Sequence, residues 1–232
     1  MPTAPLAAPA VVVAHLADFV PYLDYLTALL SPEETMRAAL YRVPAQRRLF
    51  LLSRAMLRVV LGRACGTSPD RVRYSFGSTT KPCLAPQSGL HFNLSRSADT
   101  VAIALHHQPI GVDVEIPVAG FDFAAIVETA FSAAEKACVA AGNAPATLFY
   151  QLWTRKEALA KAWGVGITDD FARLPALDGQ HYPSIAAQPP GSTAWQVASF
   201  RLPAHGTGSV AYAFSGVADT PLLYRLDALV LA

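Results

Sequence analysis

Residues 110–116 read I-G-V-D-V-E-I, a run typical of a buried β-strand except that two acidic residues interrupt it. Valine and isoleucine favour a pleated, packed environment, whereas an unpaired buried carboxylate costs on the order of several kcal/mol. Side chains alternate between the faces of a strand, so Asp113 and Glu115 project to the same side. Something cationic is therefore expected to face this pair.

A hard divalent cation would relieve the repulsion between Asp113 and Glu115. Mg²⁺ is typically held by one or two carboxylates together with substrate phosphates, and Mn²⁺ accepts the same oxygen ligands. The alternative is an exposed edge strand with two solvated acids, which is the more common meaning of an isolated D-x-E. The choice depends on what else the chain offers.

The segment T-L-F-Y-Q-L-W-T-R-K-E-A-L-A-K-A-W-G (147–164) is the clearest predicted helix, rich in good helix formers and closed by glycine. Trp153, Glu157 and Lys161 follow one another at intervals of four and lie near one face, with Lys156 on its flank. A surface salt bridge is the ordinary explanation of such charges. The tryptophans, however, indicate burial, so Glu157 is a candidate third metal ligand and the two lysines could neutralise phosphates.

Other segments predict a mixture of helices and strands. Two helices are expected within 32–63, interrupted at Pro44, with the second ending at Gly62. Three β-runs within 89–116 predict a short antiparallel meander, and later strands are expected at A-W-Q-V-A-S-F, S-V-A-Y-A-F and L-L-Y-R-L. The pentamers V-A-I-A-L (101–105) and V-A-Y-A-F (210–214) resemble each other, which suggests two similar α+β halves with a ligand between them.

Composition indicates a compact globular protein: 53% of the 232 residues are hydrophobic and 15% are charged. Residues 1–100 hold 11 Lys/Arg against 6 Asp/Glu, whereas 101–232 hold 7 against 11. This asymmetry is either ordinary surface scatter or the sign of an anionic ligand drawn to the first half, with a cation held by the second. The three cysteines lack the spacing of a zinc site or disulfide frame.

No apolar run approaches the roughly 20 uncharged residues of a membrane span. The proline-interrupted N-terminus lacks the basic region of a signal peptide, so it resembles a first strand. We expect a cytoplasmic protein that does not bind membranes. The net charge of +1 also argues against nucleic acid as a partner.

Two motifs together resemble a known family. G-V-D-V-E (111–115) and W-T-R-K-E-A-L-A-K (153–161) are similar to the paired signature of the surfactin-type 4′-phosphopantetheinyl transferase superfamily. T-K-P-C-L-A-P (80–86), F-N-L-S-R-S (92–97) and F-S-A-A-E (131–135) resemble three further family motifs. The resemblance covers residues from about 30 to 165. It implies an α+β fold of two similar halves related by a pseudo-two-fold axis, each a small antiparallel sheet packed on a long helix.

The resemblance also implies roles for individual residues. Asp113, Glu115 and Glu157 would hold Mg²⁺, or Mn²⁺, against the pyrophosphate of coenzyme A. Glu135 would be the general base, and Glu157 and Lys161 would share in catalysis. Arg48 and Arg54 would grip the 3′-phosphate. The full set implied to bind coenzyme A is Arg48, Arg54, Lys81, Pro82, Ser95, Arg96, Asp113, Lys156 and Lys161.

At three positions, the roles implied by the family resemblance need comment. Arg96 stands where the family usually has histidine, and arginine keeps the positive charge but cannot shuttle protons near neutral pH. Thr80 replaces the glycine of the family's G-K-P loop. Glu135 follows Ser132 as in a capping box, so it could serve a helix N-terminus as well as catalysis.

The implied reaction transfers the phosphopantetheine arm of coenzyme A to a serine of an apo acyl or peptidyl carrier protein, releasing adenosine 3′,5′-bisphosphate. Residues 1–108 would form the basic, nucleotide-binding half and 109–232 the metal-binding, catalytic half of a monomer. The carrier could belong to fatty-acid, polyketide, nonribosomal-peptide or siderophore synthesis. A non-catalytic coenzyme A or nucleotide-binding module is the main alternative, and a metal-dependent nuclease or phosphatase is a third. Retention of all three acids and Lys161 favours the transferase.

Overall fold

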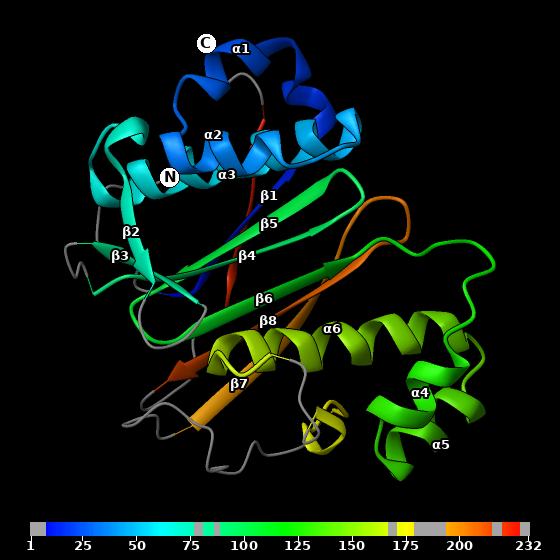
Figure 1. The fold of residues 1–232 in the computed structure, drawn as a ribbon. Helices are drawn as coiled ribbons and strands as arrows, with labels where there is room; N and C mark the ends of the chain where they lie inside the picture. Colours follow the sequence, from blue (N-terminus) through cyan, green and yellow to red (C-terminus); the bar gives the residue numbers. More distant parts are fainter. Residues whose placement is uncertain are drawn as a thin grey trace.

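The computed structural model describes residues 8–76, 81–85, 89–166, 171–178, 194–214 and 220–227 of the chain. Gly77, Thr80 and Pro86 of the T-K-P-C-L-A-P region lie outside the described residues. Two sheets meet edge to edge, each packed against a long helix (Figure 1). The predicted α+β class is thereby confirmed.

The first sheet has the order β4-β5-β1-β9, built from β1 (Ala10–His15), β4 (His91–Ser97), β5 (Thr100–His106) and β9 (Leu222–Arg225). β5 pairs antiparallel with β1 and β4, whereas β9 runs parallel to β1. The predicted first and last strands are thus present. Because β9 joins the first sheet, the end of the chain returns to the N-terminal half, across the predicted division at residue 108.

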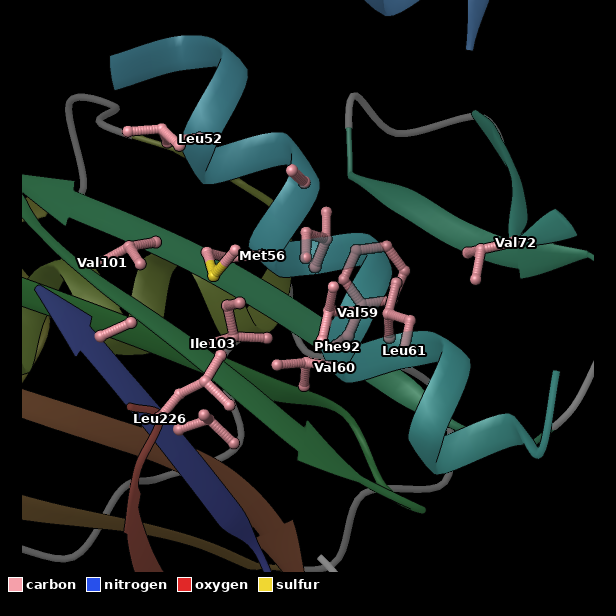
Figure 2. Close-up of a cluster of buried hydrophobic side chains, with 14 of the residues drawn as sticks. Leu52, Met56, Val59, Val60, Leu61, Val72, Phe92, Val101, Ile103 and Leu226 are labelled. Atoms are coloured by element: carbon pink, nitrogen blue, oxygen red, sulfur yellow. The ribbon is translucent and has the colours of Figure 1, made fainter. Parts of the chain in front are cut away.

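Helix α3 (Pro44–Cys65) covers one face of this sheet. Its buried leucines, valines and Met56 interlock with Phe92, Val101 and Ile103 of the strands (Figure 2). The predicted pair of helices with a break near Pro44 is confirmed, because α2 (Pro32–Ala39) ends before α3 begins at Pro44, a position that suits proline. Gly62, the predicted end, lies inside the helix, which ends at Cys65 and is capped by Gly66 in the left-handed conformation (φ 63°).

The second sheet has the order β6-β8-β7, all antiparallel, with β6 (Ile110–Glu115), β7 (Ala194–Arg201) and β8 (Thr207–Phe214). The predicted meander is therefore only partly right: β4 and β5 form a hairpin, but β6 belongs to the other sheet. Helix α6 (Pro145–Trp163) packs on this sheet and ends at Gly164, as predicted. At Gly111 a Cβ atom would collide with Ala158 O and Ala162 N, so glycine permits the close approach of β6 to α6.

The similar pentamers occupy equivalent places, because V-A-I-A-L lies in β5 and V-A-Y-A-F in β8, each a central strand beside a long helix. The pseudo-two-fold relation of the halves remains a prediction. The other elements are α1 (Leu23–Thr27), α2 (Pro32–Ala39), β2 (Arg73–Phe76), β3 (Pro82–Ala85), α4 (Ala124–Ala130) and α5 (Ala133–Ala141), with 3₁₀ turns at Leu16–Tyr22, Pro69–Arg71 and Phe171–Arg173. Within the described residues, no helix combines the length and apolarity that a bilayer crossing requires.

Candidate functional site

The two signature motifs meet at Asp113 on β6 and Lys161 on α6. The Lys161 ammonium lies 2.6 Å from Asp113 Oδ1, and the Ser95 hydroxyl donates to the same oxygen at 2.8 Å. Asp113 is only 3% exposed, and its second oxygen, Oδ2, has no hydrogen-bond partner among the described residues. A buried carboxylate thus keeps one oxygen available for a ligand.

Two further carboxylates join this centre. Glu157 Oε2 lies 3.8 Å from Lys161 Nζ, and the Ser97 hydroxyl donates to Glu115 Oε2 at 2.7 Å. Burial raises the pKa of both Glu115 and Glu157, and the charge of Asp113 adds to the shift in each case. The three predicted metal ligands, Asp113, Glu115 and Glu157, therefore lie in one partly buried region. The Lys161 ammonium lies beside two of them, Asp113 and Glu157.

The donor set fits a hard divalent cation. It consists of carboxylate oxygens, the ligands that Mg²⁺ and Mn²⁺ prefer, and Asp113 Oδ2 is unpaired. In the described part of the chain, no group of three or more ligating side chains is arranged as a preformed metal cluster. The Lys161 ammonium occupies the position between Asp113 and Glu157 and compensates their charge. A bound ion would therefore have to take the place of this ammonium beside the acids.

Lys81, predicted to contact the nucleotide, instead binds backbone carbonyls. Its Nζ donates to Ile110 O at 2.6 Å, Lys161 O at 3.0 Å and Ala162 O at 3.3 Å. Burial lowers the pKa of Lys81 to about 8. The lysine thereby joins the last turn of α6 to the start of β6. Pro82 follows it as the first residue of β3.

Lys156 and Glu135 lie away from the acids, contrary to the roles predicted for them. Lys156 is fully buried, 2.9 Å from Glu135 Oε2, and also donates to the carbonyls of Phe171, Ala172 and Leu174. Glu135 is 1% exposed and accepts from the Ser132 and Ala176 amides. Because these partners surround the Lys156 ammonium, it cannot also contact a phosphate. Glu135 is likewise not accessible to an incoming hydroxyl. The helical period alone indicates that the two lysines have different surroundings, because at about 100° per residue Lys156 and Lys161 point about 140° apart.

The remaining predicted residues lie on the first half. Arg96 on β4 is half-buried and Arg48 on α3 is exposed. Neither makes an ion pair or hydrogen bond with the residues that the structure describes. Both guanidinium groups are thus available to an anion.

Arg54 lines a cavity of about 580 Å³ formed by α2, α3 and the segment 70–74. Arg37 and Arg54 lie over the Phe50 ring, with guanidinium carbons 6.0 and 5.5 Å from its centroid. Below them, buried Arg58 pairs with Glu34 at 2.6 Å. The other lining residues are Leu30, Ser31, Pro32, Glu33, Asp70, Val72, Arg73 and Tyr74.

Sequence reasoning missed Arg37 and Arg73 as members of this cavity. Within the described residues, no ion pair is present at Arg37 or Arg54, and Arg73 bonds only backbone carbonyls. The sequence feature that could have pointed to these two arginines was the excess of Lys and Arg over Asp and Glu in the first hundred residues. The cavity therefore offers guanidinium groups to an anionic ligand.

Comparison with known proteins agrees with this site. A family model described as the 4′-phosphopantetheinyl transferase superfamily matches residues 109–214, which include β6 and α6. The chain is 32% identical over 181 residues to the 4′-phosphopantetheinyl transferase HetI of Nostoc sp., covering 75% of each chain. It is 29% identical over 160 residues to the 4′-phosphopantetheinyl transferase Sfp of Bacillus subtilis, covering 66% of this chain and 70% of Sfp.

Proposed function

The chain belongs to the 4′-phosphopantetheinyl transferase superfamily, and on this premise we propose that it transfers the phosphopantetheine arm of coenzyme A to a carrier-protein serine. The reaction releases adenosine 3′,5′-bisphosphate. One observation supports the location of the chemistry above all others: buried Asp113 contacts Lys161 at 2.6 Å and keeps an unpaired oxygen. The two halves of the family signature meet at this pair.

Asp113, Glu115 and Glu157 would hold Mg²⁺, with Mn²⁺ as a substitute. The bound ion would supply Lewis-acid stabilisation of the pyrophosphate of coenzyme A. Lys161 would move from Asp113 toward a phosphate oxygen and neutralise charge that develops on the leaving bisphosphate. Its side chain is 28% exposed, so the ammonium is accessible to a substrate.

Glu157 is the better candidate for accepting the proton of the carrier serine. Its side chain is 15% exposed, so its carboxylate is accessible to an incoming hydroxyl. Glu135 was predicted for this task, but its carboxylate is enclosed by Lys156 and two backbone amides. We therefore assign Glu135 and Lys156 to the support of α6.

The nucleotide end of coenzyme A would bind the first half. The cavity with Arg37, Arg54 and Arg73 would take the 3′-phosphate, because guanidinium groups recognise phosphate with paired hydrogen bonds. Arg96, on the strand next to β6, would contact the pyrophosphate. Arg48, which is exposed on α3 but does not line the cavity, would assist from outside it.

An acyl or peptidyl carrier protein is the expected partner, in the cytoplasm, with the transferase acting as a monomer. Val118 and Phe121, directly after β6, are 65% and 44% exposed. These exposed apolar side chains would suit a carrier helix that presents its serine to Glu157.

The test is incubation of the protein with coenzyme A, Mg²⁺ and several apo carrier proteins, followed by intact-mass measurement of each carrier. We expect the mass of one phosphopantetheine arm to be added, and the addition to disappear when the acceptor serine is replaced by alanine. No mass gain on any carrier, with coenzyme A still binding, would favour the non-catalytic module instead.

A further inference from the structure

Strand β6 forms one edge of the second sheet, since its only strand partner in the described part of the chain is β8. Alternate residues of an edge strand point their backbone groups away from the sheet, where they need other partners. In β6 and the residue after it, these groups belong to Ile110, Val112, Val114 and Ile116. They face β4, which is itself the edge of the first sheet.

Side chains of β4 satisfy three of these groups at regular intervals. The Val112 amide donates to Asn93 Oδ1 at 2.9 Å, and the Ile116 amide donates to Ser97 Oγ at 3.0 Å. Between them, the Val114 amide donates to Ser95 Oγ at 3.4 Å. Each pair is separated by 19 residues, so the two strands run side by side in a constant parallel register.

A fourth contact completes the row. The Ile110 carbonyl accepts a hydrogen bond at 2.6 Å from Nζ of Lys81, the residue before β3. Side chains of the first half thus bind one outward backbone group at each of Ile110, Val112, Val114 and Ile116. We call Lys81, Asn93, Ser95 and Ser97 the side-chain ladder.

Two members of the ladder also hold the acids. The Ser95 hydroxyl donates to Asp113 Oδ1 at 2.8 Å, and the Ser97 hydroxyl donates to Glu115 Oε2 at 2.7 Å. A hydroxyl has one proton to donate and lone pairs to accept, so each serine uses both functions at once. Each thereby fixes a carboxylate relative to the backbone of the strand that carries it.

Glu115 depends on this arrangement more than Asp113 does. Asp113 is held by Lys161 as well as by Ser95, whereas among the described residues Ser97 is the only hydrogen-bond partner of Glu115. Glu115 is also half-buried at the end of β6, with a longer side chain than aspartate. Without Ser97 its carboxylate would be free to adopt other rotamers.

We propose that Ser97 is a positioning residue that orients Glu115 for the metal, as the last member of a side-chain ladder that joins β4 to the edge of β6. The role in metal binding rests on the proposed function; the ladder itself does not. Partners that orient a metal ligand affect affinity substantially, even though they do not touch the ion.

The experiment compares Ser97→Ala with Asn93→Ala and Ser97→Thr. Asn93 is the matched control, because it belongs to the same ladder but contacts no carboxylate. Backbone amide hydrogen exchange, measured by NMR without ligands, reports on the ladder. Binding of Mn²⁺ alone, measured by electron paramagnetic resonance without coenzyme A, reports on the acids.

We expect Ser97→Ala to accelerate exchange of the Ile116 amide roughly tenfold and to weaken Mn²⁺ binding roughly tenfold or more. Asn93→Ala should accelerate exchange at Val112 but leave Mn²⁺ affinity near that of the wild type. Ser97→Thr, which keeps the hydroxyl, should restore both properties.

Unchanged Ile116 exchange in Ser97→Ala would overturn the ladder. Equal loss of Mn²⁺ affinity in Ser97→Ala and Asn93→Ala would reduce Ser97 to a structural residue and overturn the positioning role. If Ser97→Ala does not fold, Ser97→Thr takes its place in the test. Loss of protection at the Ile116 amide in Ser97→Thr would overturn the ladder, and weakened Mn²⁺ binding in this variant would overturn the positioning role. Absence of Mn²⁺ binding in the wild type would refute the metal site and with it the role of Ser97, whereas failed transfer to carriers would leave both readouts intact.

Discussion

Lys161 pairs with the acids around it and is also accessible to a ligand. It compensates Asp113 at 2.6 Å and Glu157 at 3.8 Å, yet its side chain is 28% exposed and can reach toward a ligand. A lysine is suited to this exchange of partners, since its ammonium is a compact charge on a flexible stem. In the proposed reaction, the same group would stabilise the free centre and then, with coenzyme A bound, the charge of the pyrophosphate.

Replacing Lys161 by methionine should lower kcat on the order of 10²–10³-fold, because one preorganised positive charge is lost at the phosphates. Steady-state kinetics with an apo carrier measures the effect. Lys136→Met is the control: Lys136 pairs with Glu128 on the surface at 2.8 Å. A Lys161→Met variant with wild-type kcat would exclude the proposed role.

Arg54 gives a test of where the 3′-phosphate binds. Arg54→Ala should raise KM for coenzyme A roughly tenfold, because a charged hydrogen bond to phosphate is lost. The KM for 3′-dephospho-coenzyme A should remain unchanged, since this analogue lacks the group. Arg63→Ala, an exposed arginine near the end of the same helix, is the control. Equal increases for both substrates would place the phosphate elsewhere.

At the scale of elements, α6 presents different charges to different neighbours. Glu157 and Lys161 face β6 and the acids, whereas Lys156 points into the protein toward Glu135 and the carbonyls of the 171–174 segment. The helix is thus fixed on one side by a buried ion pair and offers its functional side chains on the other. Precise placement of Lys161 depends on both.

The buried pair should be sensitive to removal of either partner. Glu135→Gln or Lys156→Met leaves a charge without compensation at a site with 1% or less exposure, which costs about 3–5 kcal/mol. The double variant should lose less than the sum of the two single variants. Urea denaturation measures these free energies of unfolding. A Glu135→Gln variant of wild-type stability and no turnover would restore Glu135 as the base.

The lowered pKa of Lys81 should make the free energy of unfolding depend on pH. Burial lowers its pKa to about 8 in the folded protein, whereas an unfolded lysine titrates near about 10.4. Between these values the unfolded chain binds a proton that the folded chain lacks, so this group makes stability rise with pH. The burial penalty of charged Lys81 is fully present below pH 8 and is relieved above it.

Comparison with Lys81→Met isolates this contribution. The free energy of unfolding of the wild type minus that of the variant should increase by about 1–2 kcal/mol between pH 7.5 and 9.5. Urea denaturation at the two pH values provides the measurement. A difference independent of pH would mean that Lys81 keeps an ordinary pKa and is more hydrated than its contacts indicate.

Strand alternation predicted that Asp113 and Glu115 share one face, and helical spacing predicted the same for Glu157 and Lys161. That these two motifs lie together was implied only by the family resemblance. Lys81 was assigned to the nucleotide and Glu135 to proton transfer on motif membership alone, whereas Lys156 was assigned to phosphate from its place on the helix as well. Motif membership does not say whether a long side chain points to a ligand or to a backbone carbonyl. The carbonyls that bind Lys81 belong to β6 and α6, so only the tertiary structure could identify them.

The position of β6 was the main error at the level of elements. Its short connection to β5 suggested a third strand of one meander, but β6 pairs with β8, about a hundred residues later in the chain. Local turn signals favour the nearest pairing, and they carry no information on a distant strand. The polar residues Asn93, Ser95 and Ser97 were the available clue, since they alternate on one face of a strand that borders another edge.

At the scale of the whole molecule, the site lies where the two sheets meet. The first half contributes Ser95, Ser97 and Lys81 to this seam, and the second contributes the acids and Lys161. Neither half holds the complete arrangement, so binding at the seam would be coupled to the packing of the halves. This explains why the functional motifs are spread over residues 81–161 and are not confined to one segment.

The most direct measurement of the central claim is intact-mass analysis of an apo carrier protein after reaction with coenzyme A and Mg²⁺, using wild-type protein and a folded Asp113→Asn variant. The wild type should add one phosphopantetheine arm to the acceptor serine and release one equivalent of adenosine 3′,5′-bisphosphate. The variant should add almost none. Full modification of the carrier by Asp113→Asn, or none by the wild type, would contradict the claim that the centre at Asp113 and Lys161 carries out the transfer.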